Sequence, residues 1–273
     1  MLEKIIYVVG PPRSGSSLIY NALCSHEKFN PAIPENHLVT NLTKDFFNQN
    51  QRNNNIEENY YFDSINDTKS YFKNCLEIFF EKISKKYQVN NLILKSITLT
   101  KNINLLNYIY PEINYIMTIR DPRDIIVSMI KVGKNQEKLN MKNQFQRNIE
   151  LLCKKINNFY WLYLEKNQTK FLNEKIYLIK YEDFIIKPSK MLNQIKQKFS
   201  LDIVYNNNLN IWSRSSNIYK ENSKIIDNPY KSNLWNKPLN KSRIGIYKAK
   251  LNNNEINQIN SFCKDIIEIF NYY

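Results

Sequence analysis

Glycine is scarce in this chain, with only four among 273 residues. Asparagine, isoleucine and lysine are abundant in every segment, which indicates a bias of the whole composition and excludes one low-complexity region. No Pro-, Gly- or Ser-rich linker divides the sequence, so we predict a single domain over residues 1–273. The positions of so few glycines are therefore informative.

Cysteine is also rare. The four cysteines, Cys24, Cys75, Cys153 and Cys263, lie far apart and form no C-x-x-C pair. This spacing excludes a recognisable zinc site or disulfide framework. We expect reduced, mostly buried thiols, as is typical of a cytosolic protein.

Long apolar runs are absent. The N-terminus MLEKIIYVVG contains a short apolar stretch, too short for the core of a signal peptide. No window approaches the roughly 18 apolar residues of a membrane span. We therefore expect a cytoplasmic protein without an integral membrane segment.

Positive charge is in excess, with 39 Lys and Arg against 25 Asp and Glu and a net charge of +14. Hydrophobic residues at 42% and charged residues at 23% are typical of a folded globule and exclude a disordered chain. The charge favours an anionic ligand: a nucleotide, nucleic acid, an acidic polysaccharide or a membrane surface.

Short apolar runs rich in β-branched residues alternate with stretches of helical spacing. This alternation predicts an α/β fold with a mostly parallel sheet, in which ligands bind at the carboxyl ends of the strands. The expected strands are Glu3–Val9, Asn91–Lys95, Asn114–Ile119 and Lys175–Lys180. The expected helices are Ser17–His26, Thr68–Tyr87, Leu99–Tyr110, Arg123–Val132, Gln136–Lys166, Ser189–Phe199 and Asn254–Phe270.

Two less regular regions, about residues 31–66 and 201–241, are rich in Asn, Tyr and Ser. We expect them to form loops over one face of the sheet, where specificity determinants usually lie. Their aromatic side chains either stack on a sugar or aryl ring or fill the core, and both roles stay open. These side chains are Tyr60, Tyr61, Trp212, Tyr219, Tyr230 and Trp235.

The stretch from Gly10 to Ser17 follows the first expected strand and opens the first expected helix. Its glycines have the spacing of the phosphate-binding motif G-x-x-x-x-G-K-[ST], but Ser16 stands at the lysine position. Without that lysine the loop is poorly suited to grip a γ-phosphate. Arg13 and the serine hydroxyls still suit an anion, and the alternative is an ordinary strand-turn-helix capped by serine.

Two motifs together carry a family resemblance. VVGPPRSGSSLIYNAL resembles the 5′-phosphosulfate-binding loop of the sulfotransferases that use 3′-phosphoadenosine 5′-phosphosulfate (PAPS), and IMTIRDPRDIIVSM resembles their 3′-phosphate motif. The resemblance implies a P-loop-like, three-layer fold with a central, mostly parallel β-sheet flanked by helices. It also implies that Arg120 and Ser128 bind the 3′-phosphate. The residues implied at the 5′-phosphosulfate are Arg13, Ser14, Gly15, Ser16 and Ser17.

Three further segments resemble the family. LILKSITL places Lys95 where the family has a residue facing the bridging oxygen of the donor, and IKYEDFIIKPSKMLNQI resembles its Tyr-Glu-Asp segment, which we interpret as structural. NKSRIGIYKAKL resembles the loop that closes over the nucleotide and implies contacts from Ser242, Arg243 and Gly245. The family commonly has Trp or a basic residue after that glycine, whereas Ile246 stands here.

Transfer of a sulfuryl group to a hydroxyl needs a base for the acceptor proton. In the branch that includes tyrosylprotein sulfotransferases and many bacterial enzymes, a Glu stands about twenty residues after the loop arginine, which implies Glu35. His37 is the alternative base. Glu27 lies in a turn-like segment, and His26 lies late in a helix, where packing or capping is the expected role.

We therefore predict a sulfotransferase that moves a sulfuryl group from PAPS to an acceptor hydroxyl, with 3′-phosphoadenosine 5′-phosphate (PAP) as product and with no metal. The acceptor is expected to be a carbohydrate or another alcohol or phenol, with or without negative charge. The alternatives are a P-loop kinase, favoured by the glycine spacing, and a basic nucleic-acid-binding protein, favoured by the charge. Lysines spread over the whole chain argue against the second alternative and predict no nucleic-acid partner.

Overall fold

A parallel sheet of four strands forms the centre of the computed structural model, in the order β2-β1-β3-β4. The structure describes residues 2–51, 61–165, 169–204, 210–215, 228–230, 232 and 234–273. The strands are β1 (Lys4–Val9), β2 (Asn91–Lys95), β3 (Asn114–Ile119) and β4 (Ile176–Lys180). All four predicted strands and the parallel pairing are confirmed.

The strand register brings the carboxyl ends of the strands to one edge of the sheet. Val8 pairs with Lys95 of β2, and Val9 pairs with Met117 of β3. The chain leaves β1 toward β2 on one side, while β3 lies on the other side, so the strand order reverses beside β1. Such a reversal point is where ligands bind in open parallel sheets.

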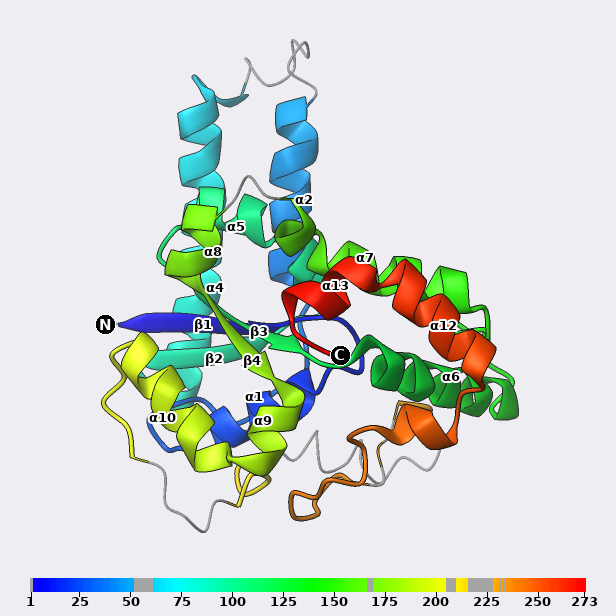
Figure 1. Cartoon of the computed structure of the whole chain (residues 1–273). Coiled ribbons are helices and arrows are strands. Elements are labelled where there is room, and N and C mark those ends of the chain that lie inside the picture. Colours follow the sequence, from blue (N-terminus) through cyan, green and yellow to red (C-terminus); the bar gives the residue numbers. More distant parts are fainter. Residues whose placement is uncertain are drawn as a thin grey trace.

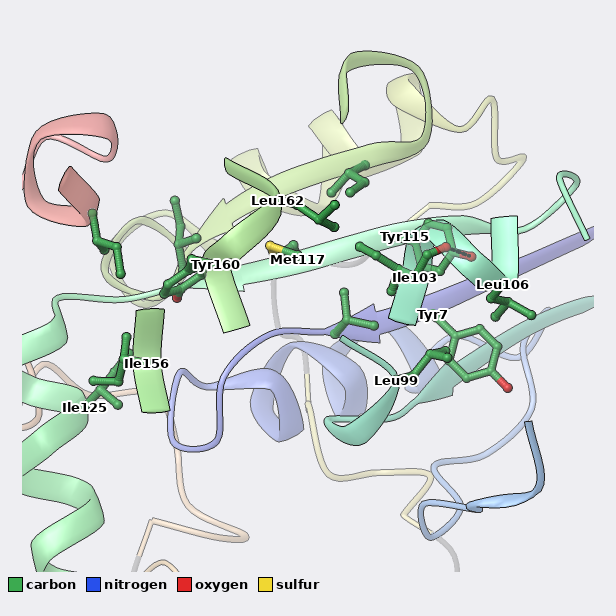
Figure 2. Close-up of a cluster of buried hydrophobic side chains, with 14 of the residues drawn as sticks. Tyr7, Leu99, Ile103, Leu106, Tyr115, Met117, Ile125, Ile156, Tyr160 and Leu162 are labelled. Atoms are coloured by element: carbon green, nitrogen blue, oxygen red, sulfur yellow. Dashed lines mark hydrogen bonds between the residues drawn. The ribbon is translucent and has the colours of Figure 1, made fainter. Parts of the chain in front are cut away.

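Helices cover both faces of the sheet (Figure 1). On one face α1 (Ser16–Cys24), α9 (Tyr181–Ile186) and α10 (Pro188–Lys198) pack on the side chains of Ile6 and Val8. The other face buries the alternate residues of β1 under a larger cluster that includes Tyr115, Tyr160 and Leu106 (Figure 2). The three-layer α/β fold expected from the sequence is therefore confirmed.

The other helical segments surround this centre. On the second face lie α4, α5, α7, α12 and α13, and α2 packs against α4. Among the described residues, no helix is long and apolar enough to cross a membrane. The bounds are α2 Leu38–Gln51, α4 Ile65–Tyr87, the 3₁₀-helix η1 Thr98–Asn102, α5 Ile103–Ile109, α6 Pro122–Lys138, α7 Ile149–Leu164, α8 Thr169–Lys175, the 3₁₀-helix η3 Ile246–Ala249, α12 Asn253–Phe262 and α13 Lys264–Ile269.

Four predicted segments differ from the structure. The stretch 99–110 is divided into the 3₁₀-helix η1 and the helix α5. The stretch 136–166 is not one helix, because α6 ends at Lys138, Asn140 takes a left-handed conformation at φ 54°, and Asn148 caps α7 by accepting from the Leu151 N–H. The region 31–66 contains the helix α2, and the predicted C-terminal helix is divided at Cys263 into α12 and α13. Apolar spacing continues across each break and does not reveal it.

Gly10 directly follows β1, at a position where the backbone conformation and the neighbouring strand exclude a Cβ atom. Its φ is 132°, and a Cβ built there would lie 2.7 Å from the backbone oxygen of Thr118. Gly245 also has a positive φ, 68°, but nothing lies within 4 Å of its Cβ position. A Cβ at Gly10 would therefore meet both a steric clash and backbone strain, whereas at Gly245 it would meet backbone strain alone.

We predict that Gly10→Ala lowers the free energy of unfolding by about 2–4 kcal/mol, because backbone strain and a clash with an immovable carbonyl add. Gly245→Ala adds strain alone and should lower it by about 1 kcal/mol. Denaturant titration of both variants measures the difference, and equal losses would contradict the steric explanation.

Candidate functional site

A cavity of about 800 Å³ opens at the carboxyl edge of the sheet. The segment after each strand contributes to its lining: Gly15 follows β1, Lys95 ends β2, Arg120 follows β3 and Tyr181 follows β4. Residues that are far apart in the sequence thus meet because parallel strands end at one edge.

The loop between β1 and α1 is fixed from below by two threonines. The Gly10 N–H donates to Thr100 Oγ1 at 2.9 Å. The hydroxyl of Ser14 is fully buried, 2.7 Å from the Pro11 carbonyl oxygen and 2.5 Å from Thr118 Oγ1. Ser14 therefore holds the loop in shape and does not line the cavity.

The upper side of this loop is the N-terminus of α1. Gly15 is the N-cap at φ 101°, and no side chain among the described residues caps the helix by a hydrogen bond. The first N–H groups of a helix lack intrahelical partners and carry partial positive charge. Ser16 and Ser17 line the cavity beside them. This arrangement suits an anion.

Arg13 connects this loop to α6. Its backbone is left-handed, with φ at 72°. Its side chain donates from Nε to Ser128 Oγ at 3.0 Å and from Nη1 to the Tyr230 carbonyl oxygen at 3.2 Å. Burial and the charges of Arg120 and Arg243 lower the pKa of Arg13 to about 10. The folded chain thus holds this proton less tightly than the unfolded chain, so the charge costs stability below that pH. A bound anion would offset that cost.

Arg120 is a buried cation of the cavity, only 6% exposed. It donates from Nη1 to the Arg13 carbonyl oxygen at 3.1 Å and from Nη2 to the Arg243 carbonyl oxygen at 2.5 Å. Its guanidinium carbon lies 4.3 Å from the centre of the Tyr181 ring. Its buried Nε has no hydrogen-bond partner among the described residues. A buried donor of this kind is costly unless a ligand completes it.

Lys95 and Glu35 form an ion pair at the other end of the cavity. Lys95 Nζ lies 2.5 Å from Glu35 Oε1 and donates to Ser17 Oγ at 3.2 Å. The Ile97 N–H donates to Glu35 Oε2 at 2.9 Å. The Lys95 side chain is 5% exposed and that of Glu35 24%. The carboxylate is therefore held in one orientation beside the anion-binding loop.

The other candidate bases have different surroundings. His37 lines the same cavity, but it is exposed, and its Nδ1 lies 3.5 Å from Thr98 Oγ1. His26 and Glu27 are not part of the lining. His26 lies beside Phe29, which agrees with the packing role expected for it.

The segment from Ser242 to Gly245 reaches the cavity through Arg243 alone. Ser242 is exposed and its hydroxyl bonds to Asn240 Oδ1. The Gly245 N–H donates to Asp124 Oδ2 at 2.8 Å. Of the predicted site residues, the cavity therefore brings together all except Ser14, Ser242 and Gly245.

Sequence reasoning missed two charged residues of α6 that line the cavity, Asp124 and Lys131. They stand four residues before and three residues after Ser128, so helical spacing would have placed them on its face. Burial, together with Arg243 and Arg13, lowers the pKa of Lys131. Lys131 thus adds to the positive field near Ser128.

The aromatic candidates divide into three groups. Trp212, Tyr230 and Trp235 line the cavity. Tyr61 is 81% exposed and does not line it. Tyr60 and Tyr219 lie outside the described residues.

Glu182, in the Tyr-Glu-Asp segment, accepts hydrogen bonds from two other segments of the chain. It accepts from the Asp121 N–H at 3.1 Å and from the Tyr272 hydroxyl at 2.9 Å. Within the described ranges, no three His, Cys, Asp or Glu side chains gather as metal ligands would. Glu182 instead joins the start of α6 to the C-terminus.

Known proteins share this fold over nearly the whole chain. The sulfotransferase domain from the curacin biosynthetic pathway is 18% identical, with a TM-score of 0.58 over 95% of this chain and 97% of that one. The sulfotransferase domain of the Synechococcus PCC 7002 olefin synthase is 16% identical, with a TM-score of 0.56 over 96% and 95%. Mouse sulfotransferase SULT7A1, solved in complex with PAP, is 13% identical, with a TM-score of 0.53 over 98% and 86%.

A comparison with curated proteins gave no significant match. The sulfotransferase family model matches residues 6–204, which include most of β1, all of β2 to β4, the Gly10–Ser17 loop and the Arg120–Ser128 segment. Because this match covers well over half of the chain, the protein belongs to the sulfotransferase family.

Proposed function

We propose that this protein transfers a sulfuryl group from PAPS to the hydroxyl of an acceptor and releases PAP. The observation that carries the proposal is the buried guanidinium of Arg120, which has an unpartnered Nε among the described residues and lines the same cavity as the N-terminus of α1, where no described side chain caps the helix. Two separated anion sites in one cavity fit a nucleotide with phosphate groups at both ends. The PAP complex of the similarly folded mouse sulfotransferase supports this choice of donor.

The donor fits across the carboxyl edge of the sheet. Its 5′-phosphosulfate would lie on the N–H groups of Gly15, Ser16 and Ser17, and its 3′-phosphate against Arg120 and Ser128. Arg13 stands between the two ends, since its Nε already contacts Ser128 Oγ. Arg243 and Lys131 add positive charge on the 3′ side.

The transfer step itself is assigned to Glu35 and Lys95. The bound donor supplies an activated sulfuryl group. Glu35 takes the proton of the acceptor hydroxyl, and the acceptor oxygen bonds to sulfur as the bond from sulfur to the bridging oxygen breaks. Lys95 Nζ, 3.2 Å from Ser17 Oγ, is placed to stabilise the negative charge that develops on the departing phosphate.

The class of acceptor is inferred from the cavity-lining residues that have no role in binding the donor. Trp212 and Trp235 offer aromatic faces suited to a sugar or an aryl ring, and Lys237 offers a positive charge. We propose a carbohydrate or another alcohol or phenol as the acceptor, and Lys237 would suit one that carries negative charge. A transfer screen with labelled sulfate over glycans, phenols, lipids and peptides tests this class.

Removal of the donor-site arginine is the first test. Arg13→Ala should weaken PAP binding by about 1.5–3 kcal/mol, because it removes a charged hydrogen bond to phosphate. Ser128→Ala removes a neutral one and should cost about 0.5–1.5 kcal/mol. Arg120→Lys keeps the charge but loses the planar donor set, so it should also weaken binding.

Arg147→Ala is the matched control for these variants, because Arg147 is paired with Glu255 on the surface. Calorimetric titration with PAP should give wild-type affinity for this control. Wild-type affinity in Arg13→Ala as well would refute the donor assignment.

The base is tested by Glu35→Gln, which keeps the shape of the side chain and one oxygen for the Ile97 N–H. Turnover should fall by roughly 10²-fold or more while PAP affinity barely changes. Steady-state rates and calorimetry on the same preparation measure both quantities. Near-normal turnover in Glu35→Gln, with the loss found instead in His37→Ala, would assign the base to His37.

Metal independence separates this proposal from a kinase. A kinase needs Mg²⁺ to neutralise charge between its phosphates, whereas Arg13, Lys95 and the loop N–H groups are placed to stabilise a departing phosphate directly. We predict full sulfate-transfer rate in excess EDTA. Loss of activity that Mg²⁺ restores would favour the kinase alternative.

A further inference from the structure

Asp124 is a fully buried carboxylate in the first turn of α6. Its Oδ2 accepts from the Gly245 N–H at 2.8 Å, and its Oδ1 accepts from the Tyr247 N–H at 3.0 Å. Both oxygens therefore hold the segment that follows Arg243. Gly245 has a positive φ of 68°, which turns the chain between its own N–H and that of Tyr247.

The same carboxylate lies beside the donor site. Asp124 Oδ2 is 3.8 Å from Arg120 Nη2, which itself donates to the Arg243 carbonyl oxygen at 2.5 Å. Arg243 is thus fixed through its own carbonyl oxygen and through the two N–H groups that follow it. Asp124 accepts hydrogen bonds from N–H groups of this segment, and Arg120 donates one to a carbonyl oxygen of the same segment.

The negative charge of Asp124 does not serve stability. Burial raises the pKa of Asp124, so the folded chain binds this proton more tightly than the unfolded chain. The charge therefore costs stability once the pH rises through the unfolded and then the folded pKa. Arg120, at 3.8 Å, offsets part of this cost but does not cancel it. A costly buried charge points to a role in binding.

We infer that Asp124 is a positioning residue that fixes residues 243–247 against Arg120, so that Arg243 can reach the 3′ side of the donor. The inference rests on the proposed function. It assigns a role to a side chain that itself touches no part of the donor. An amide at this position has one oxygen and cannot accept from both N–H groups, so Asp124→Asn breaks the arrangement with little change in volume.

The test is a double-mutant cycle on PAP affinity, measured by calorimetry. Arg243→Ala should weaken binding about tenfold in the native background and less than about twofold in the Asp124→Asn background, because the arginine is no longer held in place. Asp183→Asn, which removes an exposed carboxylate of α9, is the control and should leave the effect of Arg243→Ala unchanged.

Two results keep the inference separate from the proposed function. Equal effects of Arg243→Ala in both backgrounds would overturn the role of Asp124, while failure of the wild type to bind PAP would overturn the donor assignment. Thermal unfolding without ligand measures how much stability Asp124→Asn loses with these hydrogen bonds. A large loss of stability together with additive effects on binding would show a merely structural residue.

A measurement on the wild type serves if Asp124→Asn does not fold. Amide hydrogen exchange over residues 243–249 should slow when PAP binds, because the donor engages Arg243 and Asp124 holds the following N–H groups. Unchanged exchange under saturating PAP would overturn the inference.

Discussion

The two hydrogen bonds from Arg120 to backbone carbonyls connect the parts of this site. One reaches the carbonyl oxygen of Arg13 in the loop after β1, and the other reaches that of Arg243 near the C-terminus. A single guanidinium thereby ties two segments, each more than a hundred residues away in the sequence, to the end of β3. Its planar donor set makes this possible, which a lysine cannot do.

The sheet supplies the second constraint. Parallel strands in the order β2-β1-β3-β4 place the anion-binding loop in the middle, the Glu35–Lys95 pair on the β2 side and Arg120 on the β3 side. The Glu35–Lys95 pair and Arg120 thus lie on opposite sides of this loop along one edge. The two acidic residues of the lining, Glu35 and Asp124, each have an engaged carboxylate.

Much of this arrangement was predictable from the sequence. The four strands end where polar residues begin, and the scarcity of glycine drew attention to Gly10 and Gly15. The family resemblance implied that Lys95, Arg120 and Ser128 belong to one site, and the cavity brings them together. The base remains a prediction, although Glu35 lies against Lys95 as its assigned role requires.

Other features depend on contacts that no local pattern reveals. The hydroxyl of Ser14 faces Thr118 and leaves the cavity, because the left-handed turn at Arg13 and Gly15 redirects the loop. Asp124 is chemically unremarkable in the sequence and acquires its partners only when residues 243–247 fold back over α6. The break between α6 and α7 lies in a stretch whose apolar spacing continues, so periodicity alone predicted one helix.

The central claim is that the cavity recognises a nucleotide by phosphate groups at both its 5′ and 3′ ends. Calorimetric titration of the wild type with PAP and with adenosine 5′-phosphate tests it most directly, since the two ligands differ only by the 3′-phosphate. The account predicts that PAP binds at least about 100-fold more tightly, the equivalent of about 2.7 kcal/mol for charged hydrogen bonds to Arg120 and its neighbours. Equal affinity for the two nucleotides would contradict it.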